Sequence, residues 1–186
     1  MQRPCLQSRR NGGVTLIEVL VALFVLAVGV IGAAATQATS SRLRQQAALE
    51  SDAVALAASL AARMRVNPAQ MALPDAANPY LQLDYDGAAG APADPPLHCF
   101  ADSTCDSAQL ARFDLHEVER AVYAGFPGGR IAVCRDLDAG GALPGWDCAG
   151  GAAAPVVVKI GWRQRTGSGA PAREALPVLV MMVVAG

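Results

Sequence analysis

Glu18, a carboxylate inside an apolar run, is the first residue of this sequence that could do chemistry. Val14, Leu16 and Ile17 precede it, and seventeen uncharged residues, 19 to 35, follow it. A charged side chain at the centre of a bilayer costs about 2.5–3.5 kcal/mol, so such a residue usually has a partner. Glu18 therefore predicts an ionic contact in apolar surroundings; the alternative is a tolerated acid that reaches outwards to the interface.

Three aspartates near a glycine pair form a weaker candidate site. Asp136, Asp138 and Asp147 lie at relative positions 1, 3 and 12 of a calcium loop, with Gly141 at position 6. Position 5 is Gly140, position 12 is Asp rather than Glu, and no flanking helices are apparent. We therefore expect a solvated loop rather than a metal site.

The histidines and cysteines match no catalytic or metal pattern. His98 and His116 have no obvious Ser or Asp partner set, and no phosphate-binding glycine motif occurs. The spacing of Cys99 and Cys105 from either histidine fits no zinc pattern. The sequence thus predicts neither an enzyme nor a cofactor.

One long helix is expected to carry Glu18. It runs from Val14 to about Val66, and Asn67-Pro68 ends it, because a residue before Pro is pushed out of the α region. Its second half is periodic and predicts one buried face, made of Leu49, Ala53, Leu56, Leu60 and Met64.

The rest of the chain predicts an α+β fold in which a small antiparallel sheet packs on the second half of the long helix. Residues 69 to 106 read as irregular, with a short strand near 80–85, and a short helix begins at Asp114, with Glu117 in a capping box, and ends at Gly125. Strands are expected over 130–135, 155–164 and 177–185, with a turn at 166–169. In the second of these strands, alternation places Val156, Val158, Ile160 and Trp162 on one face and Lys159, Gly161 and Arg163 on the other.

Composition and charge exclude several classes of protein. Hydrophobic residues make up 53% of the chain, which argues against disorder, and only one apolar run is long enough to span a bilayer. The formal net charge is −1, and the head lacks basic clustering, so no nucleic acid partner is expected. Arg3, Arg9 and Arg10 precede the apolar run, which orients a segment with its N-terminus in the cytoplasm.

The N-terminal sequence resembles the processing and assembly motif of type IV pilins and type II secretion pseudopilins. A basic leader, the run Gly13-Val14-Thr15-Leu16-Ile17-Glu18 and a long apolar stretch occur together, although Val14 stands where Phe is commonest. The resemblance implies cleavage by prepilin peptidase between Gly13 and Val14, methylation of the new N-terminus, and pairing of Glu18 with a neighbouring subunit's amine. A signal peptide cut near 33–35 and a plain membrane anchor are the competing interpretations.

Segments of the head narrow the resemblance to PilV-type minor pilins. They are Phe113-Asp114-Leu115, Phe126-Pro127-Gly128-Gly129, the run from Ile131 to Asp136, and the run from Val158 to Trp162. The resemblance implies a leader at 1–13, a transmembrane or filament-core helix at 14–39, an amphipathic continuation at 40–66 and an exported head at 67–186. It also implies an inner-membrane protein with a periplasmic head that passes to the pilus, with other pilins and the inner-membrane assembly machinery as partners.

Four cysteines remain in the head if the leader, with Cys5, is removed. An even number in an oxidising compartment favours two disulfides, and four cysteines allow three pairings. We prefer Cys99–Cys105 and Cys134–Cys148, because each pair brackets a Gly- or Asp-rich loop.

The leading functional hypothesis is a non-enzymatic minor pilin that helps to initiate, assemble or modify a type IV pilus. A minor pseudopilin of a type II secretion system is one alternative. The other is an adhesive or ligand-binding module at the pilus tip, acting through loops 69–106 and 134–154.

Overall fold

The computed structural model describes residues 13, 15–94, 98–99, 104–138, 145–163 and 176–183. Several predicted features lie outside these ranges: Cys5, Val14, Gly140, Gly141 and the turn at 166–169. The chain divides into two compact units, Met1–Gln45 and Gln46–Gly186. Each unit is described by itself.

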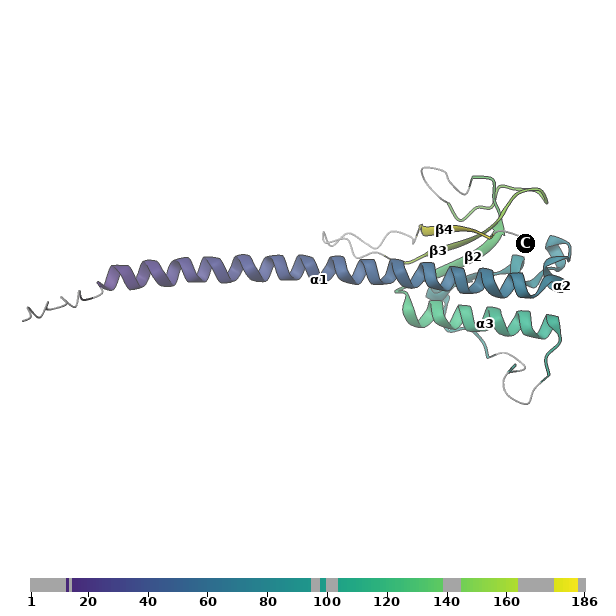
Figure 1. The fold of residues 1–186 in the computed structure, drawn as a ribbon, viewed down its shortest axis with the longest axis horizontal. Coiled ribbons are helices and arrows are strands. Elements are labelled where there is room, and N and C mark those ends of the chain that lie inside the picture. Colours follow the sequence, from purple (N-terminus) through teal and green to yellow (C-terminus); the bar gives the residue numbers. More distant parts are fainter. Residues whose placement is uncertain are drawn as a thin grey trace, which may run out of the picture. The chain divides into compact units, whose positions relative to one another are not determined.

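The first unit contains the beginning of helix α1 (Leu16–Val66), the long helix labelled in Figure 1. The amides of Glu18 and Val19 donate to the carbonyl of Thr15, at 3.0 and 3.2 Å, and close the first turn. Leu16 is the first helical residue, two positions after the predicted start, and Val14 lies outside the described residues. No proline interrupts the helix, so its backbone hydrogen bonds continue to Val66.

The second unit begins with the remainder of α1 and continues through short helical turns. The prediction that Asn67-Pro68 ends the long helix is confirmed, since α1 stops at Val66 and Pro68 opens α2 (Pro68–Met71). Three 3₁₀ helices follow, η1 (Asp75–Ala77), η2 (Pro79–Gln82) and η3 (Gly87–Ala89). The short strand expected near residues 80–85 is present as β1 (Asp84–Asp86), but η2 occupies residues 80–82.

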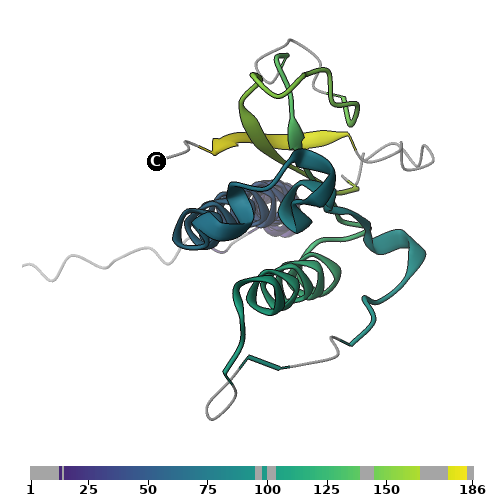
Figure 2. The ribbon, with the colours of Figure 1, turned by 90° about the vertical axis from the view of Figure 1, so that its right-hand side faces the viewer.

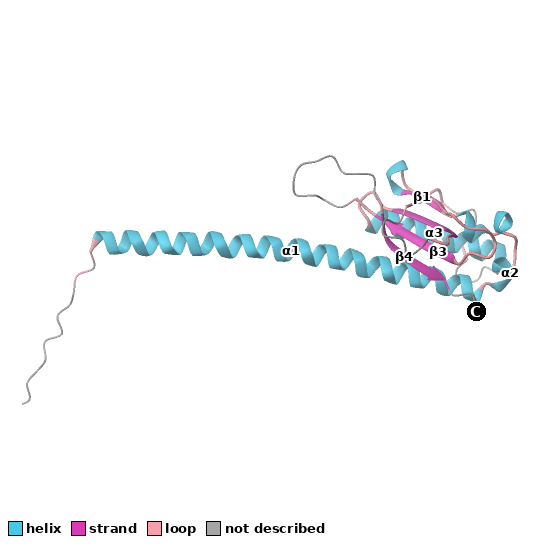
Figure 3. Ribbon diagram, turned by 90° about the horizontal axis from the view of Figure 1, so that it is seen from above, coloured by secondary structure: helices cyan, strands magenta, loops and turns pink. Residues whose placement is uncertain are grey.

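Four antiparallel strands form one sheet in the order β1-β2-β3-β4, as Figure 3 shows from above. The strands after β1 are β2 (Arg130–Arg135), β3 (Val156–Gly161) and β4 (Pro177–Val183). The predicted bounds of β2 are confirmed, and β3 is shorter than predicted at both ends. The long apolar helix and the small antiparallel sheet confirm the predicted α+β fold class.

The core of the second unit lies where α1, helix α3 (Ser107–Gly125) and the sheet meet (Figure 2). Leu60 and Met64 of α1 are fully buried, as predicted. Leu49 and Leu56 are only partly buried, because Ala57 and Ala61 complete the buried face instead. The same core contains Val118, Val122, Ile131, Val133, Val158 and Ile160.

The predicted start of the second helix is wrong by seven residues. Helix α3 begins at Ser107, and its capping box consists of Asp106 and Gln109. The Asp106 carboxylate accepts from the Gln109 amide at 2.8 Å, and the Gln109 side chain accepts from the Asp106 amide at 2.9 Å. Asp114 lies inside the helix and is 5% exposed, so it caps nothing. The predicted end at Gly125 is confirmed.

Strand β3 is buried on both faces, whereas the alternation of its residues predicted one buried and one exposed face. All six of its residues are buried, including Val157, Lys159 and Gly161 on the side away from the helices. A Cβ atom at Gly161 would lie 2.9 Å from the Trp146 ring, so the segment after residue 144 covers this face. Alternation cannot report such a cover, because the covering residues come from a distant loop.

Candidate functional site

The N-terminal candidate site is a single carboxylate on an exposed helix. Glu18 lies in the first turn of α1, where a negative charge is favoured by the helix dipole. Gly13 and Glu18 are both exposed. Among the described residues, no side chain forms an ion pair or hydrogen bond with the Glu18 carboxylate. A carboxylate without a partner among the described residues is compatible with the predicted partner, the amine of a neighbouring subunit.

An apolar surface surrounds this carboxylate. Leu16, Ile17 and Phe24 are 78%, 70% and 69% exposed. By length and composition, α1 contains an 18-residue window that could cross a membrane, and none of that window is buried. A helix that is apolar on all sides requires lipid or other helices around it. Either environment would strengthen an ionic contact made by Glu18, because both exclude water.

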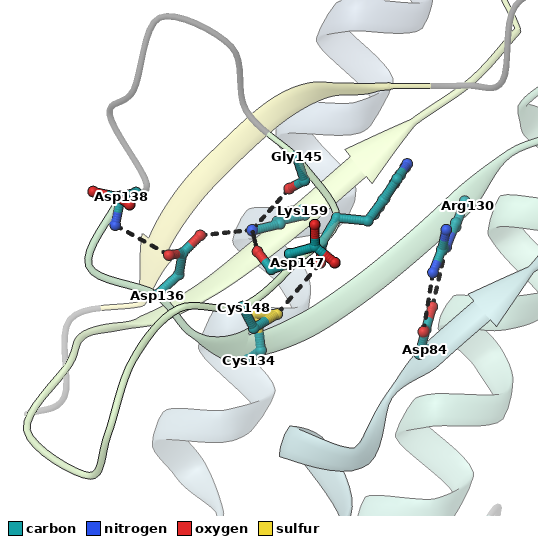
Figure 4. The surroundings of a disulfide bond; sticks show 10 residues. Asp84, Arg130, Cys134, Asp136, Asp138, Gly145, Asp147, Cys148 and Lys159 are labelled. Atoms are coloured by element: carbon teal, nitrogen blue, oxygen red, sulfur yellow. Dashed lines mark hydrogen bonds and ion pairs between the residues drawn. A yellow bond between two sulfur atoms is a disulfide. The ribbon is translucent and has the colours of Figure 1, made fainter.

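The structure contains the two disulfides expected from local spacing. Cys99 pairs with Cys105 and Cys134 pairs with Cys148, with Cα–Cα distances of 5.8 and 6.1 Å. The second disulfide closes a loop that leaves the end of β2 and returns before β3 (Figure 4). We call residues 135–147 the disulfide loop.

A buried lysine lies under the disulfide loop. Lys159 Nζ is 2.6 Å from Asp136 Oδ2, and the two side chains are 2% and 5% exposed. The same ammonium donates to the carbonyl oxygens of Gly145 at 2.9 Å and Asp147 at 2.7 Å. Figure 4 shows these three oxygens converging on the nitrogen. The lysine therefore attaches both ends of the loop to the face of β3.

The three aspartates of the weak calcium-loop pattern do not converge on one point. Asp136 turns towards Lys159, and its other oxygen accepts from the Asp138 amide at 3.0 Å. The hydrogen bond from Lys159 holds the pKa of Asp136 below its usual range, against the opposing effect of burial. Asp147 accepts the hydrogen bond from Lys159 with its backbone carbonyl, and the residue is exposed. Within the described part of the chain, no group of three His, Cys, Asp or Glu side chains could hold a metal ion.

Arg130 and Trp146 complete the cover over the sheet. The Arg130 guanidinium lies 4.6 Å from the centre of the Trp146 ring and also forms two 3.1 Å hydrogen bonds to Asp84. A guanidinium over an indole is an attractive cation–π contact. A side chain at position 161 would collide with the Leu176 carbonyl and with the Trp146 ring, so Gly161 leaves room for both. These contacts stabilise the loop and offer no reactive group.

The structure does not assemble the histidines into a catalytic set. His98 is exposed, and its ring meets the edge of Phe113 at a centroid distance of 6.4 Å. His116 is 8% exposed, and its Nδ1 has no hydrogen-bond partner among the described residues. We assign no chemical role to either histidine.

Sequence reasoning missed a polar network that joins α1, η2 and α3. Arg63 Nη1 lies 2.7 Å from Asp114 Oδ1, and the Tyr80 hydroxyl donates to Asp114 Oδ2 at 2.8 Å. The Asn67 side-chain amide donates to the Tyr80 oxygen at 3.3 Å and to the Ser107 carbonyl at 2.8 Å. The available signal was the pair of polar residues, Asn67 and Asp114, next to strongly apolar positions. This network positions the end of the long helix and has no exposed reactive centre.

Comparison with known proteins places the N-terminal site in context. Residues 8–34 match the family described as the prokaryotic N-terminal methylation motif, and this range contains Gly13 and Glu18. No curated protein and no solved structure matches the chain. The match supports a type IV pilin-like protein of a pilus or pseudopilus system, and it covers the segment in which the exposed carboxylate lies.

Proposed function

We propose that this protein is a minor pilin, a non-enzymatic subunit that helps to initiate, assemble or modify a type IV pilus. The observation that carries the proposal is the methylation motif at residues 8–34, followed by an exposed apolar helix with one carboxylate in its first turn. The α+β head with two disulfides supports an exported subunit.

The proposed sequence of events begins with removal of residues 1–13 by prepilin peptidase. Cleavage creates an α-amino group at Val14, which is methylated. In a bundle of parallel helices, the Glu18 carboxylate of one subunit then pairs with the amine of its neighbour. Each charge gains a counterion in surroundings that exclude water, which offsets the cost of burying it.

The proposed organisation follows from that role. Residues 14–39 cross the inner membrane and later join the filament core, residues 40–66 continue as the amphipathic part of the helix, and residues 67–186 form the periplasmic and then extracellular head. The partners are major and other minor pilins and the assembly machinery of the inner membrane. The hydrophobic core of the head includes residues of the second half of α1, so the head and this part of the helix form one folded unit.

The test is Glu18→Ala at matched expression in the native host. Breaking a buried pair costs about 3–5 kcal/mol, which is roughly a hundred-fold or more in association. We expect the variant to be processed and folded but to lose most of its co-purification with other pilins from membranes. Glu50→Ala is the matched control, because Glu50 is an exposed acid on the same helix, where it accepts a 3.1 Å hydrogen bond from Gln46. Equal co-purification of Glu18→Ala and the wild type would contradict the pairing.

Deletion of the gene separates the two filament systems. Loss of twitching with normal secretion supports the minor pilin. Loss of secreted enzymes with normal twitching supports a minor pseudopilin, which has the same N-terminal chemistry.

A further inference from the structure

We propose that the Lys159 ammonium is the built-in cation that holds the two described ends of the disulfide loop, residues 135–138 and 145–147, on the sheet. The order of these two ends is then independent of divalent cations. This inference concerns the head alone and holds whether or not the protein assembles into a pilus.

The first support is the completeness of the lysine's contacts. An ammonium has three N–H donors and no acceptor. Lys159 meets three oxygens, Asp136 Oδ2 at 2.6 Å, Gly145 O at 2.9 Å and Asp147 O at 2.7 Å. All three donors therefore have acceptors, and the side chain is 2% exposed. Carboxylate and backbone carbonyl oxygens are the same donor types that a calcium loop presents to its ion.

The second support is the balance of charge and ligand number. Asp136 brings one negative charge and Lys159 one positive charge, so the buried pair is neutral. Calcium takes six to eight oxygens and several acidic side chains. Asp138 and Asp147 are exposed residues, and neither of their carboxylates is among the three oxygens around the nitrogen. The site therefore suits a monovalent cation of fixed position.

The third support is the choice of amino acid. The chain has 15 Lys and Arg residues, and Lys159 is the only lysine among them. The other fourteen are Arg, so position 159 differs from the usual choice of basic residue in this sequence. A compact ammonium can direct three donors at three converging oxygens, whereas the planar guanidinium of Arg presents a wider fork. Geometry accounts for the exception.

The lysine and the disulfide act on the loop in different ways. The Cys134–Cys148 bond attaches the C-terminal end of the loop to β2, because Cys134 belongs to that strand. Lys159 belongs to β3, outside the disulfide ring, and holds atoms near both ends of the loop. Loop order should therefore depend on Lys159 even when the disulfide is intact.

The test measures amide hydrogen exchange by NMR on the full chain in detergent micelles. Two amides report loop order: Leu137, which donates to the Ala149 carbonyl at 3.0 Å, and Asp138, which donates to Asp136 at 3.0 Å. The Val133 amide, which donates to the Leu83 carbonyl at 2.9 Å, is the reference for the sheet. In the wild type we expect the same rates in EGTA and in millimolar calcium.

Lys159→Met keeps the length of the side chain and removes its charge and donors. We expect the Leu137 and Asp138 amides to exchange at least about ten-fold faster, with the Val133 amide unchanged and the disulfide intact. Arg163→Met is the matched control, because it removes an exposed cation just beyond the same strand, and it should leave both loop amides unchanged. If Lys159→Met also accelerates Val133, Asp136→Asn decides, since it keeps the lysine and should accelerate only the loop amides.

Two results would overturn the proposal. Slower loop exchange of the wild type in calcium would mean that a metal ion orders the loop. Unchanged loop exchange in Lys159→Met, or in Asp136→Asn when that variant decides, would mean that the disulfide and the backbone order it without the ammonium.

Discussion

Arg63 of α1 and Asp114 of α3 are joined by a 2.7 Å ion pair across 51 residues of sequence. The Asp114 side chain is 7% exposed and the Arg63 side chain is 37% exposed. Tyr80 donates to the second oxygen of the same carboxylate. One buried carboxylate therefore joins the last turns of the long helix to η2 and to the middle of α3.

Asp114→Asn should lower the free energy of unfolding of the head by about 1–3 kcal/mol. The change leaves the Arg63 charge without its counterion, although solvent partly screens that charge. Urea unfolding of the full chain in micelles measures the effect. Glu117→Gln is the control, because the Glu117–Arg120 pair is 3.5 Å long and its Arg120 side chain is 66% exposed, so the change should cost less than about 0.5 kcal/mol. An equal decrease in the free energy of unfolding in the two variants would show that the Arg63–Asp114 pair contributes no more than a surface pair.

Tyr80 should make the head less stable in alkali. Burial raises the pKa of Tyr80; the Asn67 donor opposes this effect, and the Asp114 carboxylate adds to it. The unfolded chain therefore loses the Tyr80 proton first, so stability falls as the pH rises past about 10, by up to ~1.4 kcal/mol per pH unit.

Tyr80→Phe removes this titration and should flatten the dependence of the urea midpoint on pH between 9 and 11. A smaller slope should remain, because burial also raises the pKa of Tyr85. Tyr123→Phe, at a 48% exposed position, should keep the slope of the wild type. If Tyr80→Phe and the wild type show the same slope, the hydroxyl does not remain protonated in the fold as the network requires.

Asp106→Ala should cost about 1 kcal/mol of stability, because it removes the cap of α3 and frees the Gln109 amide. The readout is again the urea midpoint. Asp94→Ala offers a comparison at an exposed aspartate outside the helices and should change the midpoint by less than about 0.5 kcal/mol. If Asp106→Ala lowers the stability no more than Asp94→Ala does, the cap of α3 does not stabilise the head.

Local signals in the sequence were sufficient for several elements. Asn67-Pro68 ends α1 because proline acts on its immediate neighbour, and the short pairings Cys99–Cys105 and Cys134–Cys148 follow from loops that each pair brackets. The bounds of β2 lie at Arg130 and Arg135, which flank its apolar run. In each case the deciding residues lie close together in the sequence.

Long-range contacts explain what the sequence could not predict. Asp106 with Gln109 and Asp114 with Glu117 both have the spacing of a capping box, and only the packing against Arg63 and Tyr80 shows that Asp114 is internal. Lys159 looked like an outward residue of a half-buried strand. Its burial depends on carbonyls that lie 12 and 14 residues earlier, which no periodicity reports.

The most direct test of the proposed function is the N-terminus of the protein isolated from its native host. Mass spectrometry should find a chain that begins at Val14 and carries one additional methyl group on its α-amine. The same measurement on Gly13→Val should find the uncut leader, since the resemblance places the cleavage directly after Gly13. A wild-type chain that begins near Thr36 would show ordinary signal-peptidase cleavage and would contradict the account.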